Sequence, residues 1–292
     1  MTINPQHLRF GEFQGLPALL INTPFSHAAV SLFGGHIVSF VPTGFDDLLW
    51  LSPTTKRPPD AIRGGVPICW PYFAKQGQPD DAPQHGLVRR RQWRLTHAEE
   101  TEDGEIVLAL SAPEVDGVPM TLMHTMRIGR ALEHALTTIN LSEDTVRFTQ
   151  ALHTYFKVGD AMKVSVSGLN GLTYKDKFDD FNVHTQSGDW HLNDPRDPGR
   201  SDRIYMNTGH RFELTDPALA RKIILETKNS RTLVAWNPGA DEVKNFSDIP
   251  HDAWRDYVCL EAANCDPEVI ELGPEDSHVL QQTISVVPLT QH

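Results

Sequence analysis

Cysteine is scarce in this sequence, and the usual cysteine patterns are missing. The 292 residues include only Cys69, Cys259 and Cys265, an odd number without a C-x-x-C pair. Disulfide frameworks and zinc knuckles both need cysteines that pair at short spacing. The sequence therefore argues against a disulfide-stabilised secreted protein, and a reducing cytoplasm is the simplest location to expect.

Long hydrophobic runs are missing as well. No stretch approaches the roughly 20 apolar residues that a membrane-spanning helix needs. Residues 1–20, MTINPQHLRFGEFQGLPALL, lack the basic start and the continuous apolar core of a signal peptide. We therefore expect no membrane partner.

Basic residues are outnumbered by acidic ones. Lys and Arg total 26 against 38 Asp and Glu, which gives a formal net charge of −12. Nucleic acid binding needs a basic surface, so nucleic acid is not an expected partner. A small anionic ligand is compatible with this charge if a local group of Arg or Lys binds it.

Several catalytic motifs are absent too. The sequence contains no GxxxxGK[ST] phosphate loop, no GxGxxG fingerprint, no GxSxG nucleophile elbow and no HExxH motif. Its 14 histidines are scattered, without a close pair at metal-ligand spacing. A zinc or iron site would have to assemble from residues far apart in the sequence, so we expect no metal.

What the sequence does contain is a long series of alternating apolar and polar segments. Such alternation is typical of strands with one buried face. Helical signals are few, and the best is Thr215-Asp216-Pro217, where a capping side chain precedes a proline. We predict an all-β chain, a large antiparallel β-sandwich with few short helices, as a single domain over residues 1–292. The predicted strand segments are 29–40, 105–110, 121–128, 132–141, 147–158, 163–167, 232–236, 257–261 and 283–287.

Three long loops rich in Pro, Gly and Asp interrupt the strands, at residues 53–59, 76–84 and 193–202. Long ordered loops in a compact domain often carry function. These segments are therefore candidates for parts of a functional site.

A histidine and a glutamate stand out within two strand patterns. In RFTQALHTYFKV, Phe148 and Leu152 share the more apolar face, so His153 points to the opposite side. Glu261 ends an otherwise apolar strand in DYVCLEAAN. A strand histidine of this kind is most often an ordinary surface residue. A carboxylate in a buried strand is either satisfied by a structural partner or held for proton transfer.

Two arginines are candidates for anion binding. Arg63 directly precedes Gly64-Gly65, where a bare backbone allows a ligand to approach closely. Arg89 begins a run of three arginines, which cannot all point to one side of a strand. A guanidinium donates two parallel hydrogen bonds to a phosphate, although each arginine is also compatible with a solvated surface charge.

Seven segments occur in an order that resembles one enzyme family. They are IRGGVPICWPYFA, PQHGLVRRRQW, HTYFKVGD, GLNGLTYKDK, SDRIYMN, VAWNPGADEVKNFSDIP and YVCLEAAN, spread from Arg63 to Asn264. The ordered set is similar to the hexose-6-phosphate mutarotases, also called glucose-6-phosphate 1-epimerases, of the aldose 1-epimerase superfamily, and most similar to their bacterial branch. Each motif alone is weak, whereas the ordered set covers nearly the whole chain.

This resemblance implies a galactose-mutarotase-like β-supersandwich that binds a sugar phosphate on the concave face of a curved sheet, without a cofactor. It places the catalytic histidine at His153 and the catalytic glutamate at Glu261. Trp236 would either stack on the sugar or belong to the core. After WNP the chain reads GADEVKNFSD, where the wider family often has a bulky residue. The identity of the side chains that close over the sugar ring near Trp236 is therefore left open. The substrate contacts implied by the resemblance are Arg63, Gln84, Arg89 and Asp202, with His85 as a further sugar contact.

The implied reaction opens the pyranose ring, rotates the aldehyde and closes the ring on its other face. It needs a base for the anomeric hydroxyl proton and an acid for the ring oxygen. We expect Glu261 to be the base and protonated His153 the acid, because a carboxylate and an imidazolium stabilise each other's charged forms. Arg63 and Arg89 would hold the phosphate while the ring is open.

Three other interpretations stay open. A non-catalytic sugar-binding protein would need no acid–base pair. An aldose 1-epimerase for unphosphorylated sugars would need no pair of arginines. A glycoside hydrolase needs two acids across a cleft, and only Glu261 with Asp202 could supply them. The sequence leaves the preferred hexose open, and nothing in it demands more than a monomer.

Overall fold

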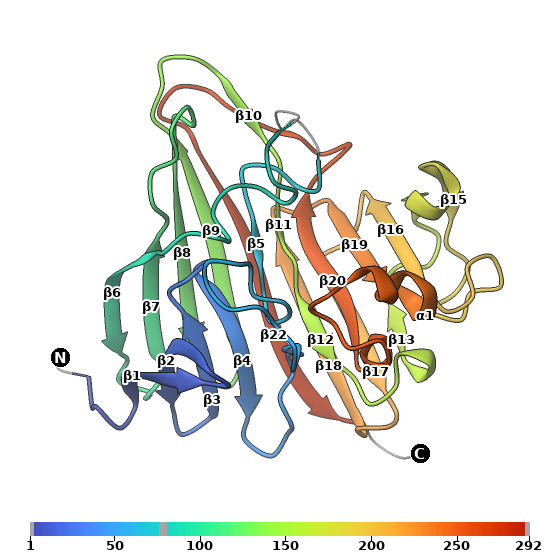
Figure 1. Cartoon of the computed structure of the whole chain (residues 1–292), viewed down its shortest axis with the longest axis horizontal. Helices are drawn as coiled ribbons and strands as arrows, with labels where there is room; N and C mark the ends of the chain where they lie inside the picture. The colour runs from blue at the N-terminus through green and yellow to red at the C-terminus, as the bar shows by residue number, and fades with distance from the viewer. Residues whose placement is uncertain (1–2, 76–80, 290–292) are drawn as a thin grey trace.

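The computed structural model describes residues 3–75 and 81–289, and these residues form β-sheets with one short α-helix. Two eight-stranded sheets dominate the fold, and their strands pair antiparallel (Figure 1). We name the eight-stranded sheet without candidate residues the support sheet. In spatial order its strands are β13 (Ser165–Ser167), β17 (Arg211–Asp216), β18 (Arg221–Lys228), β22 (Ser277–Pro288), β9 (Leu132–Asn140), β8 (Met120–Ile128), β7 (Ile106–Ser111) and β6 (Arg94–Glu100).

The other eight-stranded sheet, the site sheet, carries the candidate residues Asp202, Trp236 and Glu261 on its strands, and His153 lies between two of them. In spatial order its strands are β15 (Asn182–Thr185), β14 (Thr173–Asp176), β16 (Ser201–Met206), β19 (Thr232–Asn237), β20 (Tyr257–Asn264), β11 (Gln150–Leu152) and β5 (Ile68–Cys69), with β12 (Tyr155–Lys157) also paired to β20.

Smaller elements complete the described chain. A four-stranded sheet near the N-terminus consists of β1 (Leu8–Phe13), β2 (Leu16–Asn22), β3 (Ser26–Ser31) and β4 (His36–Pro42). A two-stranded sheet pairs β10 (Val146–Phe148) with β21 (Ile270–Leu272). The helical elements are α1 (Gly239–Glu242) and the 3-10 turns η1 (Ala161–Lys163), η2 (Lys177–Asp179), η3 (Val243–Asn245) and η4 (Ala253–Arg255). None of the helices within the described ranges is long and apolar enough to cross a membrane.

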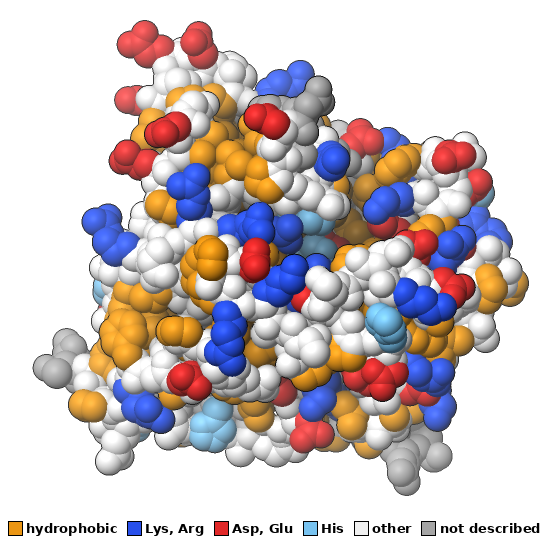
Figure 2. Space-filling model, in the orientation of Figure 1, with side chains coloured by type: hydrophobic (Ala, Val, Ile, Leu, Met, Phe, Trp, Pro, Cys, Tyr) orange, Lys and Arg blue, Asp and Glu red, His pale blue; other side chains and the backbone are white. Residues whose placement is uncertain are grey.

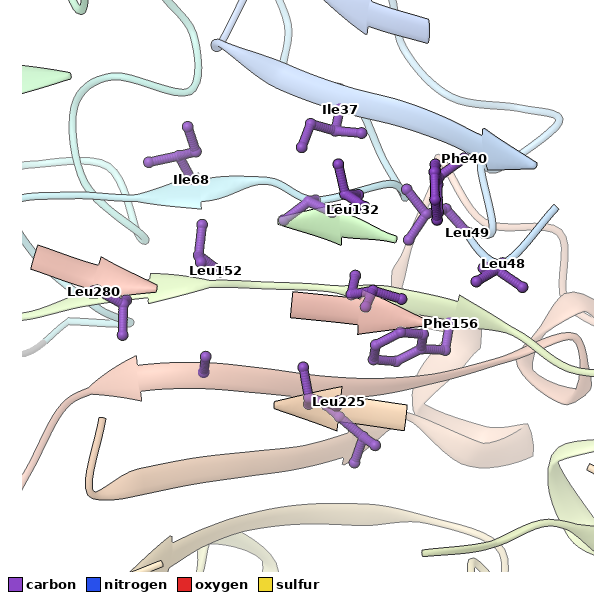
Figure 3. Close-up of a cluster of buried hydrophobic side chains, with 14 of the residues drawn as sticks. Ile37, Phe40, Leu48, Leu49, Ile68, Leu132, Leu152, Phe156, Leu225 and Leu280 are labelled. Atoms are coloured by element: carbon purple, nitrogen blue, oxygen red, sulfur yellow. The ribbon is translucent and has the colours of Figure 1, made fainter. Parts of the chain in front are cut away.

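The main hydrophobic core lies between the two large sheets because each sheet contributes one apolar face. Burial alternates along β8, which places Leu122 and Met126 inside, as the sequence pattern predicts. Burying an aliphatic side chain of this size contributes roughly 1.5–3 kcal/mol relative to leaving it in water. Figure 3 shows side chains of this core, including Leu152 and Phe156 of the site sheet and Leu132, Leu225 and Leu280 of the support sheet.

A polar network crosses this core and reaches the segment between β11 and β12 that contains His153. The carbonyl of Gly35 accepts from His124 Nδ1 (2.9 Å), and His124 Nε2 lies 3.0 Å from His134 Nδ1. Gln282 Nε2 lies 3.2 Å from His134 Nε2 and donates to Thr154 Oγ1 at 2.7 Å. Burial lowers the pKa of His124 to about 4. The chain of neutral groups therefore ties the support sheet to Thr154, the residue after His153.

The predicted all-β sandwich is confirmed, and a strand lies in or overlaps each predicted segment. The best helical signal, Thr215-Asp216-Pro217, does not begin a helix. Thr215 and Asp216 end β17, and the Asp216 carboxylate accepts from the backbone N–H groups of Ala218 (3.1 Å) and Leu219 (3.3 Å). The capping side chain therefore closes a hairpin turn. Part of the predicted loop at residues 76–84, residues 76–80, lies outside the described residues. The single domain stays a prediction.

Candidate active site

The candidate residues gather at the face of the site sheet that points away from the support sheet, some on its strands and others on loops that cover it. Side chains alternate along each strand, so Trp236 and Glu261 face outward while their neighbours Ala235 and Leu260 enter the core. Loops cover this outward face and leave a cavity of about 550 Å³. Figure 2 shows a hollow near the middle of the molecule, bordered by Lys or Arg and His side chains.

All eight residues that the sequence predicts for the site line this one cavity, although they come from distant parts of the chain. They are Arg63, Gln84, His85, Arg89, His153, Asp202, Trp236 and Glu261. Their chemical roles stay predictions. The remaining lining residues, which sequence reasoning missed, are Phe73, Ala74, Lys75, Lys177, Phe181, Ile204, Val234 and Phe246.

His153 and Glu261 form a cross-strand pair. β11 and β12 both pair with β20 in the same register, with Leu152 opposite Ala262, and this register places His153 directly opposite Glu261. His153 Nε2 lies 3.4 Å from Glu261 Oε1. The backbone N–H of His153 donates to the carbonyl of Pro67 at 3.0 Å, which fixes the residue where the β11–β12 ladder is interrupted. As predicted, His153 points away from the apolar core.

Burial changes the expected charges of this pair. His153 is only 7% exposed and Glu261 only 1%, because the loops cover both. Desolvation, with smaller contributions from Arg63 and Arg89, lowers the pKa of His153 to about 3. Desolvation and the nearby Asp202 raise the pKa of Glu261 well above its usual value. Burial therefore opposes the imidazolium and the carboxylate that the sequence analysis expects for this pair, since it disfavours both charged forms.

Arg63 reaches the cavity from the segment before β5. Its Nε donates to Asp248 Oδ2 and one terminal nitrogen donates to the Tyr155 hydroxyl, both at 3.0 Å. Its guanidinium also lies over the Phe246 ring, 5.2 Å from the centroid. These contacts hold the cation in one orientation and raise the pKa of Arg63 above its ordinary value, against the effect of burial.

The glycines after Arg63 have a structural reason that differs from the predicted one. Gly64 and Gly65 adopt φ of 104° and 63°. A Cβ on Gly64 would lie 2.3 Å from the carbonyl oxygen of Trp50, and one on Gly65 would lie 2.3 Å from that of Ile37. The close approach of neighbouring backbone is therefore enough to require glycine at both positions.

Gln84, His85 and Arg89 come from one loop. A terminal nitrogen of Arg89 donates to the carbonyl of Gln84 at 3.0 Å. The backbone N–H of Ala74 donates to His85 Nδ1 at 3.3 Å, so the proton of the neutral ring lies on Nε2. The His85 ring meets that of His153 edge-on, with centroids 5.4 Å apart. Burial, then His153, lowers the pKa of His85 well below its usual value, so His85 is a neutral donor.

Asp202 and Trp236 are neighbours on β16 and β19, where their backbones pair directly. Lys177, in η2, donates to Asp202 Oδ2 at 2.8 Å. Burial raises the pKa of Asp202 while Lys177 opposes that rise. Trp236 is partly buried and meets Phe246 edge-on, with centroids 5.9 Å apart. Phe246 belongs to the segment after WNP, so it is one of the groups beside Trp236 that the sequence left open.

Lys177 lies in the quoted segment GLNGLTYKDK, but no spacing rule distinguishes it from the neighbouring Lys175. Only the tertiary structure shows that Lys177 borders the cavity. Within the part of the chain that the structure describes, no group of three or more His, Cys, Asp or Glu could hold a metal ion. The absence of a cofactor stays a prediction.

Comparison with known proteins places this geometry in a family. The model of the aldose 1-epimerase family matches residues 17–285. An Escherichia coli K12 protein named "putative glucose-6-phosphate 1-epimerase" is 34% identical over 93% of this chain and 90% of its own length.

Solved structures agree with this family match. The crystal structure of a "putative mutarotase" from Salmonella typhimurium has a TM-score of 0.88 and 29% identity over 98% of this chain and 95% of its own. A galactose mutarotase-like protein from Clostridium acetobutylicum, at 12% identity, has a TM-score of 0.73 over 96% of this chain and 98% of its own, and shows the fold alone. The chain therefore belongs to the aldose 1-epimerase family and is an enzyme that acts on a sugar.

Proposed function

We propose that this enzyme interconverts the α and β anomers of a hexose 6-phosphate, with glucose 6-phosphate as its substrate. The observation that carries the proposal is one cavity that holds both a buried acid–base pair, His153 with Glu261, and two arginines, Arg63 and Arg89. The first pair suits ring opening and the second suits a phosphate. The names of the relatives support the same substrate class.

Ring opening needs one base and one acid at adjacent oxygens of the sugar. Glu261 takes the proton of the anomeric hydroxyl while His153 gives a proton to the ring oxygen. After the aldehyde rotates, the two groups exchange roles and the ring closes on the other face. Each cycle returns the protons to the groups that held them at the start, so the reaction consumes no co-reactant.

Buried polar atoms without a protein partner support a polar ligand in this cavity. Glu261 Oε2 and Arg89 Nε are both buried, and neither has a hydrogen-bond partner among the described residues. An unsatisfied buried polar atom costs about 1–3 kcal/mol. A sugar phosphate supplies hydroxyls for the carboxylate and phosphate oxygens for the guanidinium, so its binding would recover this free energy.

The charge around the cavity supports an anionic substrate. Among the described residues, four cationic side chains and two carboxylates line it, in a chain whose net charge is −12. The cations are Arg63, Lys75, Arg89 and Lys177. A phosphate bound to Arg63 and Arg89 keeps the substrate in place while its ring is open.

The rest of the cavity suits the sugar ring. Asp202, Gln84 and His85 offer polar groups for hydroxyls, and His85 donates through Nε2. Trp236 and Phe246 offer apolar surface for the C–H face of the ring. A monomeric state and a cytoplasmic location stay sequence-based predictions.

The direct test is anomer exchange measured at equilibrium by magnetisation-transfer NMR on chelator-treated protein. We expect the protein to accelerate exchange of glucose 6-phosphate strongly and exchange of glucose much less. Acceleration of both sugars to the same extent would indicate an epimerase for unphosphorylated sugars. Binding without acceleration of either sugar would indicate a non-catalytic sugar-binding protein.

Lys177→Met should weaken substrate binding more than turnover. Without the ammonium, burial of Asp202 favours its protonated form, and a protonated carboxyl is a poorer hydroxyl acceptor. We expect KM for glucose 6-phosphate to rise about two- to tenfold, with kcat nearly unchanged. Steady-state exchange rates measure both constants. Lys175→Met is the matched control, because Lys175 pairs with Asp266 and does not line the cavity. A kcat loss without a change in KM would contradict this role for Lys177.

A further inference from the structure

Each of the two arginines is linked to His153 through an aromatic ring. Arg63 donates to the Tyr155 hydroxyl at 3.0 Å, and the Tyr155 ring stacks on the His153 ring with centroids 5.0 Å apart and an interplanar angle of 10°. Arg89 donates to the carbonyl of Gln84, and the adjacent His85 meets His153 edge-on. A group that binds both arginines therefore acts on the surroundings of His153 from two sides.

Without a bound anion, these surroundings oppose the protonation states that the proposed mechanism needs. The arginines oppose a positive charge on His153, and burial opposes a negative charge on Glu261. Both effects favour the form of the pair in which the proton is on Glu261, whereas the proposed mechanism needs a carboxylate base and an imidazolium acid. The titratable or charged groups around His153 are Glu261, Arg63, Arg89, His36, His85 and Tyr155.

A bound phosphate changes which of the two residues, Glu261 or His153, is favoured to hold the proton, without adding a proton to the pair. Its negative charge offsets the two guanidinium charges, and the offset is large because charges interact strongly in a cavity shielded from water. A positive charge on His153 then becomes more favourable. The proton has to cross only the 3.4 Å between Glu261 Oε1 and His153 Nε2.

Building on the proposed function, we propose that the substrate's own phosphate activates the catalytic pair. When the phosphate binds Arg63 and Arg89, the O–H bond of Glu261 breaks and an N–H bond forms on His153. The net charge of the pair stays zero, and no co-reactant is needed. The phosphate is therefore an activator of catalysis as well as an anchor. Free hexoses would be poor substrates even at saturating concentration, because they leave the proton on Glu261.

The test supplies the phosphate group separately from the sugar. Exchange of glucose is measured by magnetisation-transfer NMR with increasing phosphite dianion, and the rate in enzyme-free phosphite is subtracted at each concentration. We expect phosphite to raise the enzyme-dependent rate saturably, by about tenfold or more, as expected when a general acid becomes available. Glu261→Gln protein is the control and should show no activation.

The outcomes separate this inference from the proposed function. If phosphite competes with glucose 6-phosphate but leaves glucose exchange unchanged, the phosphate is only an anchor and the inference is wrong while the function stands. If phosphite neither competes nor activates, the arginines do not bind a phosphate, and the inference fails with their assignment. If glucose 6-phosphate exchange itself is not accelerated, the proposed function is wrong.

The position of the proton is measured separately by NMR of protein labelled with ¹⁵N-histidine. The His153 signals, identified with the His153→Gln variant, should indicate a neutral ring in the free protein at pH 7. They should indicate an imidazolium after saturation with phosphite. Signals of a neutral ring in both states would overturn the inference even if phosphite binds.

Tyr155→Phe tests the link from Arg63. This variant loses the hydroxyl that accepts from Arg63 and keeps the ring that stacks on His153. We expect the phosphite activation of glucose exchange to fall about two- to tenfold. Tyr72→Phe is the matched control, because Tyr72 does not line the cavity. Full activation in Tyr155→Phe would exclude Tyr155 from the effect.

Discussion

Glu261→Gln is expected to lower kcat for anomer exchange of glucose 6-phosphate by about 10²- to 10⁴-fold, the usual contribution of a general acid or base. The amide has nearly the same shape but cannot take the anomeric proton, so KM should change little. Exchange rates measured by magnetisation transfer over a range of substrate concentrations separate the two constants. The variant should fold, because the substitution removes an ionisable group that burial already penalises.

His153→Ala should show a similar loss of turnover, since the ring oxygen then lacks its acid. The double variant should lose little more than either single variant, because the two groups act as one unit. A thermal unfolding measurement on each variant separates loss of chemistry from loss of structure. Turnover close to that of the unchanged protein in either single variant would remove that residue from the mechanism.

Arg89→Met should lower kcat/KM for glucose 6-phosphate by about 10- to 150-fold, the cost of losing hydrogen bonds to a charged group. Glucose exchange should not fall, because glucose carries no group for Arg89 to bind. Arg63→Met should likewise lower kcat/KM for glucose 6-phosphate without lowering glucose exchange. It should also lower the stability of the protein, because Asp248 loses its ion pair. Both sugars are measured on each variant by the same exchange experiment.

The run of three arginines provides a matched control for this prediction. Arg90 is exposed and pairs with Asp60 outside the cavity, so Arg90→Met should leave both sugars unaffected. An equal loss on glucose and on glucose 6-phosphate in Arg89→Met would contradict a phosphate-binding role. In that case Arg89 would act on the shape of the loop, through its hydrogen bond to the Gln84 carbonyl.

Much of the fold and the membership of the site could be predicted from the sequence. Alternation alone places Leu152 in the core and His153 on the opposite face, because side chains of a strand point to opposite sides. The same rule separates Leu260 from Glu261. The resemblance to the ordered family motifs identified the other candidate residues of the site. No spacing rule could have brought them together, because they come from distant segments.

Only the tertiary structure decided the electrostatics of the site. Alternation places His153 outside the core, but it cannot show that loops cover the outward face and leave the residue 7% exposed. Because burial depends on those long-range contacts, alternation could not show that burial opposes the charges expected for His153 and Glu261.

The tertiary structure also decided the surroundings of the cations. The pairing of Arg63 with Asp248 joins residues 185 positions apart, and Lys177 meets Asp202 only because η2 folds over β16. The contacts of the glycines at 64 and 65 could not be predicted from the local sequence either, since the backbone that approaches them comes from other segments. A local pattern determines which way a side chain points, whereas its environment is set by segments that the pattern does not contain.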